Sequence, residues 1–184
     1  MFRVAVLVAN KSEEMEVIIP IDIWRRAGII VNTISIEKNK NVVLNSGLKI
    51  SCDSVLSAEN LTKYHALYLP GGAGCDRFNE KLTPKLVAFY KKNVSKLDFT
   101  FMSACAATKC FYEWGLPADI KVTCYPGIQT GKFVSQYVNK TVSISKNFIT
   151  TQGPGTIIEF SFEVVKKFVS PAIAKKVKTQ MLIK

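Results

Sequence analysis

Short apolar segments alternate with segments of helical spacing along this chain, and no other feature constrains the fold as much. Apolar, β-branched runs typical of buried strands occupy residues 2–9, 30–36, 66–69 and 99–103. Helices are expected at residues 15–26, 84–92, 105–115, 155–169 and 171–181. Strands that alternate with helices form βαβ units, so we expect a mostly parallel sheet with helices on both faces. The sequence therefore predicts a doubly wound, flavodoxin-like α/β fold.

Length and hydropathy fit a single domain over residues 1–184. The chain has 184 residues, of which 48% are hydrophobic, enough to bury a sizeable core. Weaker signals predict short strands near Val42 and at residues 49–52, a helix around Ala58, and strands at residues 122–125, 137–143 and 148–151.

Composition limits the classes of function. The formal net charge is +11, but the lysines are scattered without aromatic interleaving, which indicates a solvated basic surface and at most weak nucleic-acid binding. The five cysteines form no CxxC pair and no cluster at zinc spacing, so we expect reduced thiols, no metal and no cofactor. The first apolar run is too short for a membrane span and lacks a cleavage site, so we expect a cytoplasmic protein without membrane contact.

Cys105 lies where an apolar strand breaks into the small-residue segment SACAA. In doubly wound sheets, ligands bind beyond the carboxyl ends of the strands, where we expect residues 10–14, 70–74 and 104–107 to meet. A strand that turns directly into a helix strains the junction residue and projects its side chain into the crevice. The start of the helix should also favour the thiolate and lower the Cys105 pKa. Cys105 is thus a candidate nucleophile; the alternative is a small, buried core residue.

Two further components of a catalytic site accompany this cysteine. The segment LPGGAG ends a central strand, so the backbone N–H groups of Gly72 and Ala106 are candidates for an oxyanion hole; the alternative is a loop that needs positive φ. Glu16 heads an apolar helix and is a candidate proton carrier with a raised pKa; the alternative is charge complementarity at a helix end. The only histidine, His65, begins its strand and should lie roughly 20 Å from the glycines at ~3.3 Å per residue.

Four sequence blocks resemble the ThiJ/PfpI superfamily, and in particular its DJ-one branch. They are EEMEVIIPIDIWRRAGI at residues 13–29, LPGG at 69–72, SACAAT at 103–108 and GPGTIIEF at 153–160. The resemblance covers essentially the whole chain, including the last helix. It implies a flavodoxin-like homodimer with Cys105 as the nucleophile, a protonated Glu16 hydrogen-bonded to it, and oxyanion donors at Gly72 and Ala106.

The resemblance also places Gly71, Tyr125 and Pro154 around the expected pocket. At some positions, however, this sequence departs from the superfamily pattern. Tyr125 stands where many relatives have a histidine; a phenol with a pKa of about 10 is a poor base at neutral pH, although it can donate a hydrogen bond. A protease with a Cys–His pair is therefore disfavoured. Gly47 and Gln152 stand where relatives can carry arginines, which leaves the anion affinity of the site open.

The resemblance implies a glutathione-independent glyoxalase and protein deglycase. The thiolate would attack methylglyoxal, glyoxal or their early glycation adducts on proteins, and Glu16 would then move a proton between adjacent carbons. The alternative is a redox-sensing chaperone in which Cys105 is oxidised to sulfinic acid and stabilised by Glu16. The helix from Met15 to Gly28 is apolar on more than one face, so we expect the homodimer to form through it.

Overall fold

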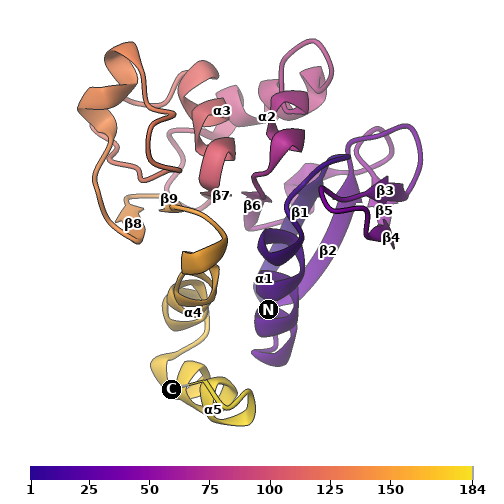
Figure 1. Cartoon of the computed structure of the whole chain (residues 1–184), viewed down its shortest axis with the longest axis vertical. Coiled ribbons are helices and arrows are strands. Elements are labelled where there is room, and N and C mark those ends of the chain that lie inside the picture. The colour runs from indigo at the N-terminus through magenta and orange to yellow at the C-terminus, as the bar shows by residue number, and fades with distance from the viewer. Residues whose placement is uncertain (184) are drawn as a thin grey trace.

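A seven-stranded, mostly parallel sheet forms the centre of the structure, a computed structural model that describes residues 1–183. The strands lie in the order β5-β2-β1-β6-β7-β9-β8 (Figure 1). Their bounds are β1 (Arg3–Val8), β2 (Ile30–Ser35), β5 (Ser54–Val55), β6 (Ala66–Leu69), β7 (Thr100–Ala104), β8 (Val142–Ser145) and β9 (Phe148–Thr151). β8 runs antiparallel to β9, whereas the other neighbours are parallel. A separate antiparallel pair consists of β3 (Asn41–Val43) and β4 (Lys49–Ser51).

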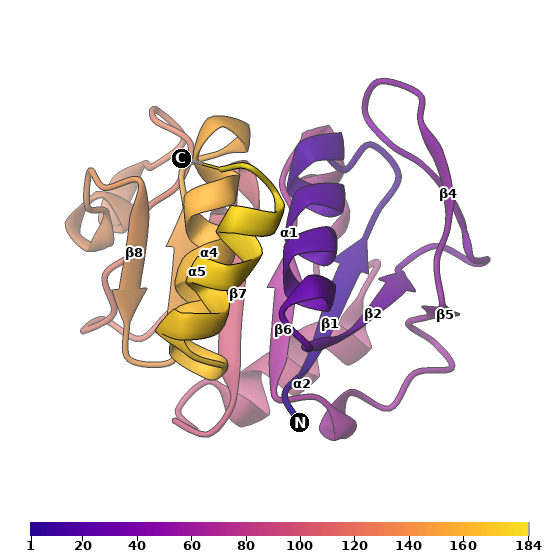
Figure 2. The ribbon, with the colours of Figure 1, turned by 90° about the horizontal axis from the view of Figure 1, so that it is seen from below.

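Helices cover both faces of the sheet (Figure 2). One face carries α1 (Glu14–Arg26), α4 (Ile157–Phe168) and α5 (Pro171–Gln180), and the other carries α2 (Pro84–Asn93) and α3 (Thr108–Glu113). The loops contain the 3-10 helices η1 (Leu61–Lys63), η2 (Ala73–Arg77), η3 (Cys105–Ala107), η4 (Gly131–Gln136) and η5 (Pro154–Thr156). Within residues 1–183, no helix has the length and apolar character that a membrane span requires.

Each central strand supplies side chains to two apolar cores. Along β1, Ala5 and Leu7 join the core beneath α2 and α3, while Val4, Val6 and Val8 join the core beneath α1, α4 and α5. This alternation follows from the period of two along a strand, and burial on both faces explains why the strand is apolar throughout. The arrangement confirms the expected doubly wound, flavodoxin-like α/β fold.

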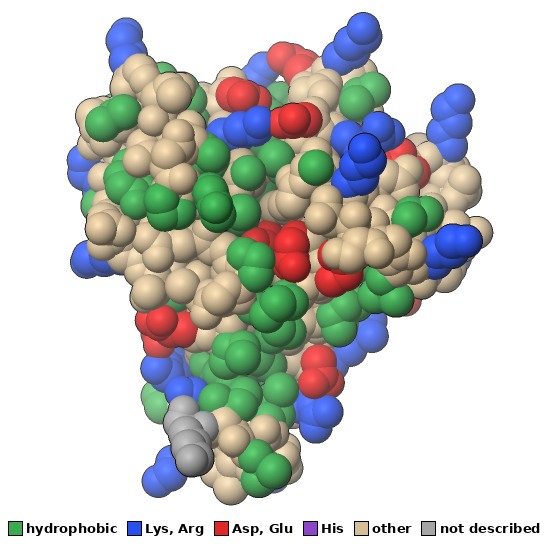
Figure 3. All heavy atoms as spheres, viewed as in Figure 1, with side chains coloured by type: hydrophobic (Ala, Val, Ile, Leu, Met, Phe, Trp, Pro, Cys, Tyr) green, Lys and Arg blue, Asp and Glu red, His purple; other side chains and the backbone are tan. Residues whose placement is uncertain are grey.

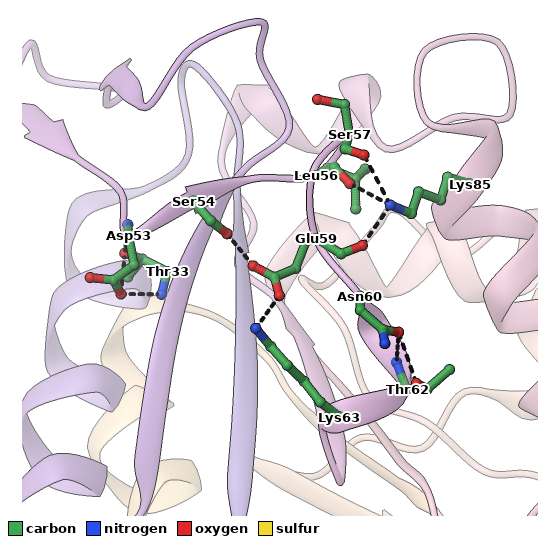
Figure 4. A network of polar contacts seen from close by, with 10 residues as sticks. All are labelled: Thr33, Asp53, Ser54, Leu56, Ser57, Glu59, Asn60, Thr62, Lys63 and Lys85. Atoms are coloured by element: carbon green, nitrogen blue, oxygen red, sulfur yellow. Dashed lines mark hydrogen bonds and ion pairs between the residues drawn. The ribbon is translucent and has the colours of Figure 1, made fainter.

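The segment after β5 is a turn, and the expected helix around Ala58 is wrong. The ammonium group of Lys85, at the start of α2, binds the carbonyl oxygens of Leu56, Ser57 and Glu59 at 3.1, 3.1 and 2.5 Å (Figure 4). An α-helix through Ala58 would use these carbonyls for its own hydrogen bonds four residues along the chain. The Lys85 side chain, which comes from another element, therefore occupies the carbonyl oxygens that a helix would need, and the segment forms a turn instead.

Two expected strands in the C-terminal half also differ from the structure. Residues 122–125 form no strand: Val122 makes an isolated bridge with Tyr137, and the N–H of Thr123 donates to the Thr150 hydroxyl at 2.8 Å. A side-chain hydroxyl thus takes the place of a ladder partner. β8 begins and ends later than the expected strand at residues 137–143, because Lys146, with a φ of +52°, makes the turn that pairs β8 with β9.

Candidate functional site

Cys105 lies at the sharp turn between β7 and η3. Its φ is +56°, in the left-handed region that residues with a side chain seldom adopt. The turn is tight because η3 begins directly after Ala104, the last residue of β7. The Cys105 side chain is partly exposed, whereas the other four cysteines are buried. The structure thus has the strained junction expected from the small-residue segment, and this junction lies at the carboxyl edge of the sheet.

Glu16, near the start of α1, is fully buried beside this cysteine. Its Oε2 accepts a hydrogen bond from the Gly71 N–H at 2.6 Å, and the carboxyl group faces the Cys105 sulfur. The other oxygen, Oε1, is buried and has no hydrogen-bond partner within residues 1–183. A buried polar atom without a partner is costly, so this oxygen is available to a proton, a thiol or a substrate.

Glu13 fixes the position of Glu16. As the N-cap of α1, Glu13 accepts a hydrogen bond from the Glu16 N–H at 2.8 Å through its Oε2. Its own N–H donates to the Gly71 carbonyl at 3.1 Å. The start of α1 is therefore bound directly to the loop after β6, which brings the first two of the three expected segments together.

The glycine loop after β6 packs too closely for side chains. A Cβ added at Gly71 would lie 2.7 Å from the Cys105 Cβ and 2.8 Å from Glu16 Oε2. Gly72 has a φ of +86°, and a Cβ there would lie 2.6 Å from a backbone nitrogen of the loop after β1. The backbone N–H groups of Gly72 and Ala106 donate toward the Cys105 sulfur. Both N–H groups expected from the sequence therefore lie at the sulfur, and their role as oxyanion donors stays a prediction.

The two ionisable groups of the site have raised pKa values. Burial raises the pKa of Glu16 from 4.5 to about 7; the Gly71 N–H opposes this rise and the charge of Glu13 adds to it. Burial, and next the Glu16 carboxylate, raise the pKa of Cys105 to about 12, against the two backbone N–H groups. Burial and the proximity of the two groups therefore favour the protonated form of each, and the Glu16 pKa is the closer of the two to neutral pH.

The Cys105 pKa is thus raised rather than lowered, although the Ala106 N–H at the start of η3 opposes the rise, as expected of a helix start. The sulfur lies at the head of η3, a single 3-10 turn, and α3 after it has only six residues. So short a helical segment has a small dipole, which does not offset the loss of water around a buried sulfur beside a carboxylate.

A shallow cavity of about 170 Å³ is lined in part by Tyr125, Gly153 and Pro154, and Gly153 connects it to Cys105 and Glu16, which do not line it themselves. A Cβ added at Gly153 would lie 3.8 Å from each of three atoms, Cys105 Sγ, Glu16 Oε1 and Tyr125 Cδ2. Gly153 thus marks the point where the thiol, the carboxyl group and the half-exposed phenol ring converge. No role was assigned to it from sequence, although the GPG segment after β9 carries the same glycine signal as LPGG.

The remaining residues considered from sequence lie elsewhere or add little to the site. His65 lies at the amino end of β6, where its Nδ1 accepts a hydrogen bond from the Arg3 N–H at 3.0 Å. Gln152 lines the same cavity as Tyr125. Gly47, in the turn between β3 and β4, has a φ of +97°. Within residues 1–183, no group of three or more His, Cys, Asp or Glu side chains is placed to hold a metal ion.

Comparison with known proteins gives a consistent result. The DJ-1/PfpI family matches residues 2–167. The chain is 29% identical over 187 residues to the Parkinson disease protein 7 homolog of Danio rerio, which covers 99% of this chain and 97% of that protein. It is 25% identical over 178 residues to the glutathione-independent glyoxalase DJ-1 of Schizosaccharomyces pombe, over 92% of this chain and 93% of that protein.

Solved structures are similar over the same length. The structure of oxidized Toxoplasma gondii DJ-1 has a TM-score of 0.91 and 27% sequence identity, over 99% of this chain and 98% of that chain. The sequence match includes α1, the glycine loop and the cysteine turn. The structural match covers 99% of the chain and so includes the sheet that brings these three parts together. These findings confirm the resemblance of the four sequence blocks, and the chain therefore belongs to the DJ-1/PfpI family.

Proposed function

We propose that the chain is a cysteine-dependent, glutathione-independent glyoxalase that also acts as a deglycase on early glycation adducts. The observation that carries this proposal is the buried Oε1 of Glu16, which has no hydrogen-bond partner within residues 1–183. A Cβ added at Gly153 would lie 3.8 Å from this oxygen and 3.8 Å from Cys105 Sγ. A nucleophile and a proton carrier thus reach the same small space. The pKa of Glu16, at about 7, suits a group that must both take and give a proton near neutral pH.

The first step is addition of the sulfur to the aldehyde carbon of methylglyoxal. The C–S bond forms as the carbonyl π bond opens, and the thiol proton passes through Glu16 to the carbonyl oxygen, giving a hemithioacetal. Transfer of this proton to Glu16 during the attack means that a free thiolate is not required, in keeping with the raised pKa of Cys105. The N–H groups of Gly72 and Ala106 stabilise the negative charge that develops on the oxygen.

The second step moves a proton between two carbons. Glu16 takes the proton from the carbon bonded to sulfur, the electron pair forms a C=C bond, and the ketone oxygen becomes an enediolate. The carboxyl group then returns this proton to the adjacent carbon, while the hydroxyl proton on the carbon bonded to sulfur passes to the former ketone oxygen and leaves a C=O bond on that carbon. The product is a thioester of lactate with Cys105. Water cleaves the C–S bond, the thiol regains its proton, and lactate leaves. Methylglyoxal and one water give lactate, and glyoxal by the same steps gives glycolate.

The comparisons support this proposal through one relative, since the Schizosaccharomyces pombe protein is named a glutathione-independent glyoxalase. For the deglycase activity, the same thiol would attack early adducts of dicarbonyls with Lys, Arg or Cys side chains, and the partly exposed Cys105 side chain favours access to them. The chemistry needs a reduced thiol, which fits the proposed cytoplasmic location. We also propose that a single domain, residues 1–184, carries the whole site.

Purified protein given methylglyoxal without glutathione tests the proposal. Proton NMR should show many equivalents of lactate per chain, and Cys105→Ala should reduce the rate to the uncatalysed background. Formation of lactate by Cys105→Ala at the wild-type rate, or less than one equivalent per wild-type chain, would refute the proposed reaction.

A second candidate function is redox sensing coupled to a chaperone activity. Oxidation of Cys105 by peroxide to sulfinic acid would place new oxygens beside Glu16 Oε1, which has no partner in the reduced chain within residues 1–183. A protonated Glu16 can donate a hydrogen bond to such an oxygen. The two functions differ in rate: a sensor should show peroxide-dependent binding of unfolded proteins with little turnover of methylglyoxal.

We also propose a homodimer through α1. Met15 and Ile18 on this helix are 44% and 42% exposed, and Ile158 on the neighbouring α4 is 38% exposed. Figure 3 shows hydrophobic side chains gathered in a band over the region of α1 and α4. A contiguous apolar surface of this kind is typical of a protein interface, and a two-fold contact would cover the same band on both copies.

A further inference from the structure

A second cavity, distant from the cysteine, lies at the amino edge of the sheet. It has a volume of about 450 Å³ and lies between the last turn of α2 and the residues that precede β6 and β7. In Figure 2 this edge is the lower one, beside the N-terminus, whereas the glycine loop and Cys105 follow the opposite ends of the same two strands. Small-molecule sites typically have volumes of about 300–1,000 Å³. The proposed glyoxalase reaction uses none of its lining residues.

Ammonium groups dominate the charge of this cavity. Lys63, Lys92 and Lys96 line it, and among its described lining residues the acidic side chain is Asp98. Lys63 already pairs with Glu59 (Figure 4). Lys92 and Lys96 form no ion pair within residues 1–183. Two ammonium groups are therefore available to an anion, opposed by one carboxylate.

Hydrogen bonds hold the polar wall of the cavity in place. The turn that carries Lys96 is fixed by the buried Asn147, whose Nδ2 donates to the carbonyls of Val94, Lys96 and Phe99 at 3.1, 3.0 and 3.1 Å. His65 also lines the cavity, and its Nδ1 accepts from a backbone N–H. The proton of the neutral ring is then on Nε2, which is left as a donor. The wall is thus formed before any ligand binds.

Aromatic rings form the apolar part of the lining. Phe89 and Phe99 pack edge to face with centroids 5.1 Å apart, and Tyr64 also lines the cavity; Tyr64 and Phe99 are 4% and 7% exposed, so the partly exposed Phe89 offers the ring surface. A cavity with both ammonium groups and ring surfaces matches a ligand that has an anionic group and a flat apolar group. Phosphate esters fit the first requirement because they carry a charge of about −1.5 to −2 at pH 7. We propose that this cavity binds a small organic phosphate with a planar ring, of the nucleoside monophosphate class.

Titration of the full chain with adenosine monophosphate, followed by amide NMR, tests this proposal. The shifts should concentrate at residues 62–65 and 92–99. Adenosine without its phosphate, and inorganic phosphate without a ring, should each bind more weakly than the nucleotide. Binding should also weaken as salt is raised, since exposed charges are screened. A Cys105→Ala chain should bind as the wild type does, which separates this site from the proposed reaction.

Variants that change the charge of the cavity should shift nucleotide affinity in opposite directions. Replacing both lysines (Lys92→Gln with Lys96→Gln) should weaken nucleotide binding about tenfold, from the loss of two exposed charge contacts. Asp98→Asn should strengthen it, because it removes the opposing carboxylate. The matched control is Lys175→Gln with Lys176→Gln on α5, which removes the same net charge from exposed positions that do not line the cavity.

Three results would overturn the proposal. One is the absence of binding at millimolar nucleotide, and another is a map of shifts confined to other residues. The third is an equal loss of affinity in the two double-lysine variants, which would mean that the nucleotide responds only to the overall positive charge of the chain.

Discussion

Gly71→Ala tests whether close packing of the glycine loop holds the proposed catalytic groups in position. An alanine Cβ at this position would lie 2.7 Å from the Cys105 Cβ, 2.8 Å from Glu16 Oε2 and 3.0 Å from the Ala104 carbonyl oxygen. All three distances are below the 3.4 Å at which ordinary van der Waals contact begins. The φ of Gly71 is outside the left-handed region, so the effect arises from packing rather than from backbone strain.

The expected size of the effect follows from these contacts. The obstructing atoms belong to a strained junction, a fully buried carboxyl group and the backbone, so none can move aside at little cost. Overpacking of this kind costs about 1–3 kcal/mol. Each kcal/mol lowers the Tm of a chain of this size by about 2–4 °C, so we expect a fall of about 2–12 °C. Displacement of Glu16 should also slow methylglyoxal turnover by about ten- to a hundredfold.

Gly155→Ala is the matched control for stability, because no atom lies within 4 Å of a Cβ added there and its φ is not positive; Gly155 lines the same cavity as Tyr125, so the comparison of the two variants is made on Tm. Thermal unfolding by circular dichroism and steady-state kinetics with methylglyoxal would be measured on both variants. Gly155→Ala should stay within about 0.5 kcal/mol of the wild type. An unchanged Tm and kcat in Gly71→Ala, or equal losses of Tm in the two variants, would refute the packing argument.

Three further predictions concern stability, specificity and assembly. The folded-state pKa of Glu16 is raised from 4.5 to about 7, so its contribution to stability is present below pH 4.5 and is lost as pH rises through about 7. Because 2.5 pKa units correspond to about 3 kcal/mol, the free energy of unfolding of Glu16→Gln in urea should rise relative to that of the wild type, by an amount of this order, between pH 4.5 and pH 8.5, since the glutamine does not titrate; a constant difference would count against the assignment. Tyr125→Phe should lower kcat less than about tenfold, since a phenol is a weak base at neutral pH, and a larger loss would place its hydroxyl in the proton transfer. Ile18→Asp should convert the proposed dimer to a monomer in sedimentation experiments, and a monomeric wild type at micromolar concentration would contradict the interface.

The elements that were predictable from sequence are those whose periodicity is strong and local. The buried strands and long helices are apolar in a pattern set by the sheet itself, so their existence follows from the chain alone. The segment around Ala58 was not predictable, because its carbonyls are bound by Lys85 from another helix. The Thr123 N–H likewise donates to the hydroxyl of Thr150 in β9. Both failures come from side chains that are distant in sequence and replace backbone partners.

For the candidate site, local residue types indicated the cysteine turn and the glycine loop, but not the electrostatics. The rise in the Cys105 pKa depends on burial and on a carboxylate delivered by α1, neither of which the segment SACAA contains. The place of Gly153 depends on the approach of η5 to α1 and β7, which only the folded sheet defines. The catalytic roles proposed for Cys105 and Glu16 remain predictions.

The central claim is that Glu16 transfers the proton between the two carbons of a substrate bound to Cys105. The most direct test is kcat for methylglyoxal in Glu16→Gln, which keeps the size and hydrogen-bonding capacity of the side chain but cannot exchange the proton. We expect kcat to fall about 10²- to 10⁴-fold, the range typical of general acid–base catalysis, while circular dichroism shows a folded chain. A folded Glu16→Gln chain that turns over methylglyoxal at the wild-type rate would contradict the claim and confine this carboxyl group to a structural role.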